Sequence, residues 1–248
     1  MEKRLIILSG PSCVGKGPLT AAVKKFRPNI KFTKLAVIKS KQSRNHIPRP
    51  DEQTVWDNQN CWQSEEQIKA LKDNDRYIVG NCYDFSQAVD LDMIVNSSEQ
   101  TILMEMYYAL VPQLLDSQHL KNINIETVFL SPIGKQEIDF FNSCGIDIGS
   151  AIKSLMAAKQ YKRAIFHKRK IDRDFLQDIK TRIDDAVCEI ESAKNFKYVI
   201  VNHDGEGSPN WNRLADGTFT APPVGDAKLA VESLADILIG KKIKKSEL

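Results

Sequence analysis

The chain has 248 residues, of which 42% are hydrophobic, and carries a formal net charge of +3 with a pI near 8.5. This length and apolar content support a sizeable core, and they favour one domain with insertions over two domains. The net charge is too small to indicate nucleic-acid binding by itself.

The cysteines argue against a disulfide framework and against a structural zinc site. They are odd in number, scattered, and form no CxxC motif or His/Cys cluster: Cys13, Cys61, Cys82, Cys144 and Cys188. The sequence shows no signal peptide, and its opening apolar run is too short to span a membrane. We therefore expect a cytoplasmic protein with reduced thiols and with neither a membrane nor a nucleic-acid partner.

The most informative stretch lies near the amino terminus. Residues 5–8 have the length and branching of a buried parallel strand. The following segment, GPSCVGK, has the spacing of a phosphate-binding loop between a strand and a helix. Its glycines allow a tight turn whose backbone N–H groups point at an anion, and Lys16 can reach the β- and γ-phosphates. The residues expected to bind ATP are Gly10, Ser12, Cys13, Val14, Gly15, Lys16 and Gly17.

The alternative is a glycine-rich turn with a solvated Lys16, but the helix-like LTAAVKKF that follows favours the phosphate loop. The position after Lys16 nevertheless departs from the pattern. It usually carries a Ser or Thr hydroxyl for Mg²⁺, whereas this chain has Gly17 and Pro18, and Thr20 comes too late to replace the hydroxyl. Because water and substrate phosphates can hold Mg²⁺, we expect weakened rather than abolished catalysis.

A cationic segment follows the second predicted strand, which covers residues 32–38. This segment contains Lys39, Lys41, Arg44, His46 and Arg49, with prolines at positions 48 and 50. Such a run is commonly a solvated loop. In a chain that already has a phosphate loop, it also fits a proline-stiffened loop that binds a second phosphate on an acceptor.

A short helix is predicted over residues 64–72, with Ser64 as its cap and acidic residues in its first turn. A brief strand at residues 77–79 and a turn at Gly80-Asn81 should follow it.

Another central strand is predicted over residues 100–106, with Glu105 near its carboxyl end. Open α/β sheets place ligands at that end. A carboxylate there can hold a hydrated Mg²⁺ or accept hydrogen bonds from a base, the alternative being a surface glutamate.

The second half continues the alternation of helices and strands. A helix at 109–115, a strand at 123–130, a basic helical region at 134–194, a last strand at 196–201 and a final helix at 227–239 are expected. The end of the basic region has apolar residues at helical spacing, and Arg182 is expected at the beginning of that helix. This alternation predicts an α/β fold with a parallel sheet covered on both faces.

With these pieces placed, most of the chain resembles the guanylate kinase family of P-loop nucleoside monophosphate kinases. The resemblance rests on GPSCVGKGPL, PRPDE at 48–52, SEEQIKAL, Gly80-Asn81-Cys82-Tyr83 with Ser86, TILMEM, and TRIDDAVCEI followed by FKYVIVNHD. It implies a P-loop NTPase three-layer sandwich in a single domain, 1–248. Its core would comprise 1–38, 100–133 and 195–240, its acceptor-binding segment 39–99 and its lid 134–182.

The resemblance also implies roles for particular residues. Arg44, Arg49 and Tyr83 would hold the acceptor phosphate, and Ser86 would touch its base. Glu105 would be an acceptor-site acid and an outer-shell Mg²⁺ ligand. Arg182 would be a lid arginine that reaches the transferring phosphoryl group, with Arg169 or Arg163 beside it. Lys16, Arg182 and Arg169 form the expected catalytic set.

Departures from the family pattern make the acceptor uncertain. The family's guanine-binding glutamate would fall in the region Asp73-Asn74-Asp75-Arg76, and no residue there can be assigned to that contact. In the strand that carries Glu105, a second position that is acidic in the family is Leu103 here. The insertion at 205–225 has no counterpart in the family. A packed loop with a buried Trp211 explains it better than a base-stacking role does.

The sequence therefore predicts an ATP-dependent kinase that phosphorylates a nucleoside monophosphate, with GMP or dGMP favoured and with Mg²⁺ as cofactor. A kinase for another small phosphorylated acceptor and a catalytically inactive binding module of the same fold are the alternatives. A monomer or a homodimer is expected.

Overall fold

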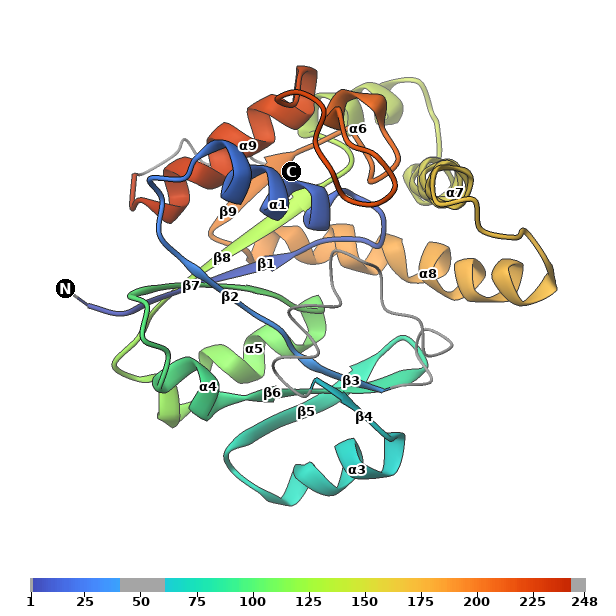
Figure 1. Cartoon of the computed structure of the whole chain (residues 1–248). Helices are drawn as coiled ribbons and strands as arrows, with labels where there is room; N and C mark the ends of the chain where they lie inside the picture. Colours follow the sequence, from blue (N-terminus) through green and yellow to red (C-terminus); the bar gives the residue numbers. More distant parts are fainter. Residues whose placement is uncertain (1, 41–60, 242–248) are drawn as a thin grey trace. The chain divides into compact units, whose positions relative to one another are not determined.

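The structure is a computed structural model, and it describes residues 2–40 and 61–241 of the chain. Five strands form one parallel sheet flanked by helices, in the order β2 (Thr33–Leu35), β7 (Thr101–Glu105), β1 (Arg4–Ser9), β8 (Asn124–Ser131) and β9 (Tyr198–Val201) (Figure 1). The central position of β1 agrees with its sequence, because an uncharged, branched run suits a strand covered on both faces. The expected α/β class with a parallel central sheet is confirmed.

The chain divides into two compact units, one made of residues 1–8 and 31–127 and the other of residues 9–30 and 128–248. The first unit contains, besides strands of the parallel sheet, a second sheet in the order β4 (Trp62–Gln63), β3 (Ile38–Ser40), β6 (Phe85–Asp90) and β5 (Tyr77–Cys82). The α-helices among its described residues are α3 (Glu65–Ala70), α4 (Leu91–Val95) and α5 (Val111–Leu115).

The helix α3 forms as the sequence predicts. Ser64 is its N-cap, and the Ser64 hydroxyl accepts from the backbone N–H of Gln67 while the Gln67 side chain accepts from the N–H of Ser64. This capping box satisfies two N–H groups that a helix start leaves without partners. Ile68 is the buried residue of the helix, and it packs in a small core with Ile38 and Ala88.

The second unit holds the larger helices, which are α1 (Lys16–Phe26), α6 (Lys135–Ser143), α7 (Ile148–Phe166), α8 (Arg173–Ser192) and α9 (Gly225–Leu238). In this unit α1 packs against α9, and α7 packs against α8. Asp147 and Asp172 cap α7 and α8 by accepting hydrogen bonds from Ser150 N and Phe175 N. The two capped helices carry most of the basic residues expected between 134 and 194.

The structure corrects three local predictions. The strand expected over 32–38 is two short strands, β2 and β3, which belong to different sheets. The turn expected at Gly80-Asn81 lies inside β5, and the chain instead reverses at Tyr83, whose φ of 56° is left-handed. Arg182 lies in the middle of α8 rather than at the start of a helix, because the amphipathic pattern extends back to the Asp172 cap.

None of the helices in the described part of the chain combines the length and the apolar composition that a membrane span requires.

Candidate functional site

The predicted phosphate loop, in the second unit, needs both of its outer glycines. Gly10 has a φ of 141°, and a Cβ there would overlap the carbonyl oxygen of Leu130 on β8. Gly15 is the N-cap of α1 with a φ of 104°, and a Cβ there would lie 2.9 Å from both Asn202 Nδ2 and the Asp204 carbonyl oxygen. These positions combine left-handed backbone with close approach, which glycine alone accommodates. The GPSCVGK spacing is therefore dictated by the fold of this segment.

Residues 202–206 donate hydrogen bonds to two carbonyl groups of the loop, one from a side chain and one from the backbone. Asn202 is fully buried, and its Nδ2 donates to the carbonyl oxygen of Val14 at 2.8 Å. The backbone N–H of Glu206 donates to the carbonyl oxygen of Cys13 at 3.0 Å. Fixing these carbonyl groups restricts the peptide planes of the loop, as is needed in a backbone predicted to bind anions through its N–H groups.

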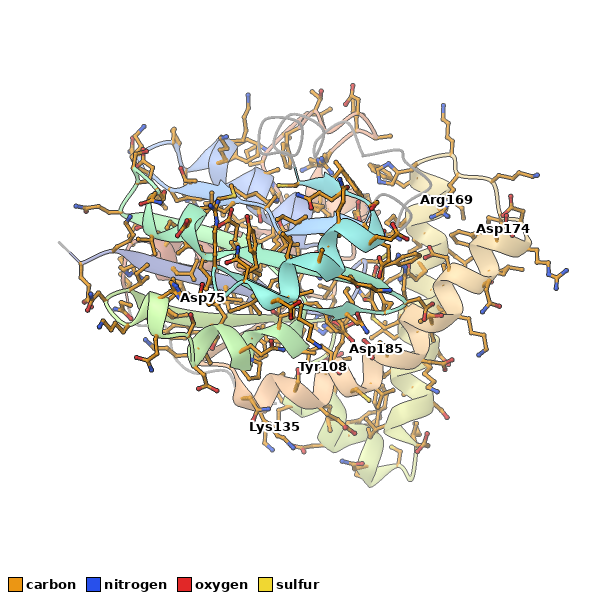
Figure 2. All side chains as sticks on the ribbon, turned by 90° about the horizontal axis from the view of Figure 1, so that it is seen from below. Asp75, Tyr108, Lys135, Arg169, Asp174 and Asp185 are labelled. Atoms are coloured by element: carbon orange, nitrogen blue, oxygen red, sulfur yellow. The ribbon has the colours of Figure 1, made fainter. Side chains whose placement is uncertain are left out.

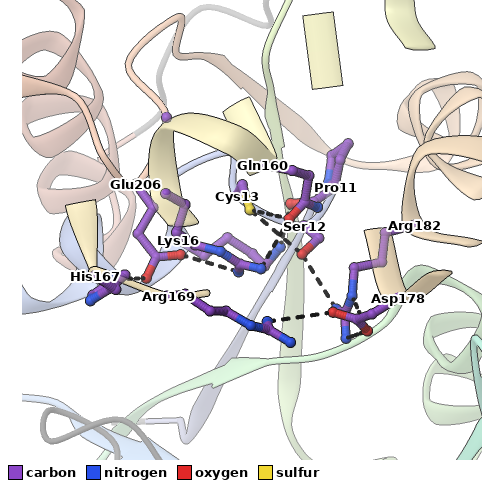
Figure 3. Close-up of polar contacts among 12 residues, drawn as sticks. Pro11, Ser12, Cys13, Lys16, Gln160, His167, Arg169, Asp178, Arg182 and Glu206 are labelled. Atoms are coloured by element: carbon purple, nitrogen blue, oxygen red, sulfur yellow. Dashed lines mark hydrogen bonds and ion pairs between the residues drawn. The ribbon is translucent and has the colours of Figure 1, made fainter. Parts of the chain in front are cut away.

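Lys16 folds back over the same loop. Its Nζ donates to the carbonyl oxygen of Pro11 at 2.9 Å and also to that of Gly10 (Figure 3). The Lys16 ammonium group is thus held at the loop itself, within the segment that the sequence predicts to bind phosphate. Exchange of these carbonyl partners for phosphate oxygens requires only rotation of a flexible side chain.

Cys13 is a buried residue in an unusual backbone conformation, with a φ of 72°. Its Sγ donates to Gln160 Oε1 on α7 at 2.9 Å. Burial raises the pKa of the Cys13 thiol, and the nearby Arg163 only partly opposes this effect. The thiol therefore stays protonated near neutral pH and ties the loop to α7.

Arg163 and His167 of α7 both face the carboxylate of Glu206, which belongs to the insertion. Arg163 Nη1 lies 3.5 Å from Glu206 Oε2, and His167 Nε2 lies 3.4 Å from Glu206 Oε1. Arg163 also donates to Gln160 Oε1 at 3.0 Å. The Glu206 side chain is only 5% exposed, so a negative charge on it needs a neighbouring cation such as Arg163 to stabilise it.

Arg182 and Arg169 share a second carboxylate, that of Asp178. Nε and Nη2 of Arg182 donate to Asp178 Oδ1 at 3.0 and 2.9 Å, and Arg169 Nη1 lies 3.6 Å from Asp178 Oδ2 (Figure 3). Arg182 Nη1 also donates to the Ser12 hydroxyl at 3.4 Å. The structure thus brings Arg182 to the phosphate loop and joins Arg169 to it through one carboxylate.

The position of Arg169 follows from the end of α7. Lys168 has a left-handed φ of 51°, and the N–H of Arg169 donates to the Ala164 carbonyl oxygen at 2.8 Å, which ends the helix. The Arg169 guanidinium lies 5.1 Å from the ring centre of buried Phe175. Figure 2 shows Arg169 and Asp174 at the end of the α7–α8 pair where the two helices are connected.

A cavity of about 470 Å³ lies between α7 and residues 203–209. Its apolar lining includes Leu155, Ala158, Ile165 and Phe166. Gly205 lines the cavity as well, and a Cβ on Gly205 would lie 2.9 Å from the Cys13 carbonyl oxygen, so the cavity begins beside the phosphate loop. Lys159 also lines it; burial lowers the pKa of this lysine to about 8, and its Nζ donates to the His203 carbonyl oxygen.

In the first unit, buried Ser86 and half-buried Glu65 form a polar pair. The Ser86 hydroxyl donates to Glu65 Oε1 at 2.6 Å, and the Ser86 N–H donates to both Glu65 oxygens, at 3.1 and 3.2 Å. Burial opposes ionisation of Glu65, but these hydrogen bonds outweigh it and leave the pKa of Glu65 below its usual value. Ser86, which we expect at the acceptor base, thus binds the carboxylate of Glu65, one of the acidic residues in the first turn of the predicted helix.

The other predicted acceptor residues are placed separately. The Tyr83 ring lies 5.5 Å from that of Tyr107, centre to centre. Glu105 ends β7, and its Oε1 accepts from Lys34 Nζ of β2 at 2.6 Å. Arg44 and Arg49 lie outside the described residues.

The side chains at the phosphate loop do not form a protein-held Mg²⁺ site. Gly17 offers no side-chain oxygen, and the Thr20 hydroxyl donates to the Lys16 carbonyl oxygen at 3.0 Å. No group of three or more His, Cys, Asp or Glu residues within 2–40 and 61–241 is arranged to hold a metal ion. The carboxylate of Glu105, the metal ligand that the sequence suggests, is paired with Lys34.

Three residues of the loop's surroundings were not found by sequence reasoning: Gln160, Asp178 and Glu206. Asp178 precedes Arg182 by one helical turn, a spacing at which an ion pair could have been expected. Gln160 lies one turn before its partner Arg163, but its hydrogen bond to Cys13 links distant segments, as does the ion pair of Glu206 with Arg163, so these two contacts gave no such signal. Trp211 is fully buried, as predicted, and its Nε1 donates to the Gly205 carbonyl oxygen at 3.0 Å.

No protein-family model matches this sequence, and no curated protein matches it either. Among solved structures, the chain is similar to the crystal structure of guanylate kinase from Anaplasma phagocytophilum. The two share 12% sequence identity with a TM-score of 0.51, and the match covers 98% of this chain and 88% of that one. This similarity concerns the fold, and it agrees with the α/β P-loop NTPase fold expected from the sequence.

Proposed function

We propose that this protein is an ATP-dependent kinase that transfers the γ-phosphoryl group to a nucleoside monophosphate, with GMP or dGMP favoured. The observation that carries the proposal is the phosphate loop between β1 and α1. Gly10 and Gly15 are both left-handed there, Lys16 folds over the loop, and Arg182 donates to Ser12. A concave backbone with several cations is suited to the β- and γ-phosphates of a nucleotide. The fold, shared with a guanylate kinase, supports a nucleotide substrate.

The donor would bind through the second unit. Backbone N–H groups of residues 12–17 would surround its β-phosphate, and Lys16 would follow the γ-phosphoryl group during transfer. Arg182 and Arg169 would stabilise the charge that spreads over that group in the transition state. The cavity beside Gly205 has the size of a small-molecule site and an apolar wall, which suits the donor's nucleoside.

The acceptor would bind through residues of the first unit. Arg44, Arg49 and Tyr83 are proposed to hold its phosphate, and Ser86 and Glu105 to contact its base. No general base is required, because the acceptor phosphate is already an anion. Catalysis would depend on positioning and electrostatic stabilisation.

Mg²⁺ would be carried by the phosphate oxygens of ATP and by water rather than by side chains of the loop. The bound ion would neutralise charge on the transferring group. This assignment agrees with the loop geometry, because Gly17 offers no hydroxyl and Thr20 donates to a backbone carbonyl.

A screen of monophosphates with Mg-ATP tests the acceptor. We expect GMP or dGMP to be turned over faster than AMP, CMP, UMP or a ribosyl phosphate. Equal turnover of all acceptors would contradict the preference for guanine, and turnover of none would contradict the kinase.

The missing hydroxyl supports a second candidate, a catalytically inactive binding module. Calorimetry with ATP, with and without Mg²⁺, distinguishes the two. A kinase should bind ATP in at least one of these conditions, whereas absence of binding in both would leave only the binding module.

A further inference from the structure

The two carboxylates beside the phosphate loop differ in burial. Glu206, which holds Arg163, is 5% exposed, whereas Asp178, which holds Arg182 and Arg169, is 28% exposed. A buried ion pair cannot separate without leaving a charge unpaired in a poorly solvated site. The side chains of Arg163 and Arg182 are equally buried, at 15% exposed each, so the difference lies in the carboxylates. Water can replace an arginine at the partly exposed Asp178 carboxylate but not at the buried Glu206 carboxylate. Arg163 therefore stays paired, whereas Arg182 and Arg169 can exchange Asp178 for another anion.

The Asp178 carboxylate lies between the guanidinium groups of Arg182 and Arg169, a position in which a phosphoryl group could contact both. One oxygen accepts from Nε and Nη2 of Arg182, and the other faces Nη1 of Arg169 at 3.6 Å (Figure 3). Arginine binds carboxylate and phosphate through the same planar arrangement of N–H donors. The Ser12 hydroxyl, on the loop itself, accepts from the remaining Arg182 nitrogen at 3.4 Å. The paired arginines therefore already contact the loop.

We propose that Asp178 is an internal substitute for phosphate, which occupies Arg169 and Arg182 until the terminal phosphate of the donor displaces it. Donor binding exchanges one anion for another at the same two guanidiniums. The inference rests on the proposed function for the identity of the donor. The exchange itself concerns only a polyphosphate anion and the side chains of Ser12, Arg169, Asp178 and Arg182.

This exchange makes Asp178 a competitor of the ligand. Replacement of Asp178 by Asn keeps the side-chain shape and removes the charge, so both arginines become available without displacement of a carboxylate. A residue that merely supports the helix would have the opposite effect, because its loss would weaken every ligand interaction of α8. The direction of the change in affinity therefore separates the two roles.

The test is calorimetric titration of inorganic tripolyphosphate, and separately of ATP, into the wild type and four variants. Asp178→Asn should lower the Kd for tripolyphosphate by about three- to tenfold. Asp178→Glu should stay near the wild type. Asp184→Asn is the matched control, because Asp184 lies on the same helix and also joins two cations, Lys153 and Lys180. It should change the Kd by less than about twofold.

Thermal unfolding accompanies the titrations, and Asp178→Ser provides a second neutral variant with the same expected tightening. An unchanged or higher Kd in the folded neutral variants would overturn the inference. Tightening in Asp184→Asn as large as in Asp178→Asn would also overturn it, because a general charge effect would then suffice. A wild type that binds tripolyphosphate but phosphorylates no acceptor contradicts the proposed kinase only, since the ratio between wild type and Asp178→Asn still tests this inference.

Discussion

The backbone N–H of Glu206 donates a hydrogen bond of 3.0 Å to the carbonyl oxygen of Cys13. This bond joins the insertion at 205–225 directly to the phosphate loop. The side chain of the same glutamate pairs with Arg163 of α7. The segment that the sequence analysis interprets as an insertion thus contacts both the loop and the helix beside it.

Glu206→Gln should destabilise the second unit, because it leaves the Arg163 guanidinium without its buried counter-charge. We expect a loss of about 1–3 kcal/mol in the free energy of unfolding, measured by urea denaturation. Glu191→Gln, on the exposed side of α8, is the charge-matched control and should change stability by less than about 0.5 kcal/mol. Equal effects of the two variants would show that the Glu206 ion pair has no special role.

Cys13 should tolerate glycine better than alanine. Both changes remove the hydrogen bond to Gln160, but glycine accommodates the φ of 72° without strain. Cys13→Gly should therefore be more stable than Cys13→Ala by about 0.5–1 kcal/mol in denaturant unfolding. If Cys13→Ala were the more stable of the two variants, residue 13 would not adopt the left-handed conformation.

Gly17→Ser should restore the hydroxyl that the loop lacks. A Cβ on Gly17 would meet nothing within 4 Å, so the side chain fits without rearrangement. We expect the ATP affinity of this variant to depend more strongly on Mg²⁺ than that of the wild type, by about two- to tenfold. Gly17→Ala controls for the added Cβ. A serine variant with the Mg²⁺ dependence of the alanine variant would show that the hydroxyl does not reach the metal.

His203 should make stability depend on pH. Burial of its ring opposes protonation, but hydrogen bonds to Glu137 and Asp226 outweigh burial and raise the pKa of His203. A raised pKa in the folded state means that the stabilisation is complete below the unfolded value of about 6.5 and is lost as the pH rises through the folded value. The stability difference between the wild type and His203→Asn, measured by thermal unfolding, should shrink from pH 6 to pH 9. A constant difference over this range would rule out the charged contact.

The sequence was most informative where local chemistry decides the structure. The branched run of β1, the GPSCVGK spacing and the Ser64 cap each depend on neighbouring residues, and all three appear as expected. The split of 32–38 into two strands could not be predicted, because it depends on which strands lie beside each half. Likewise, the ion pair of Arg163 with Glu206 and the hydrogen bond of Cys13 to Gln160 each join distant segments, so no local spacing predicts them.

The arginines show the same limit at the site. Sequence resemblance named Arg163, Arg169 and Arg182 together, since all three are basic residues of one helical region. Their separation into a fixed arginine and two exchangeable ones depends on the burial of Glu206 and Asp178. Burial is a property of packing, and periodicity predicts it poorly when the carboxylate belongs to a loop or faces another helix.

The proposed kinase activity requires that the loop from Gly10 to Gly17 bind the phosphates of a nucleotide with the help of Lys16. Isothermal titration of Mg-ATP into the wild type and into Lys16→Ala tests it most directly. We expect the wild type to bind, the variant to have a Kd at least about tenfold higher, and thermal unfolding to be unchanged. Equal affinity of both proteins, or no binding by a folded wild type, would contradict it.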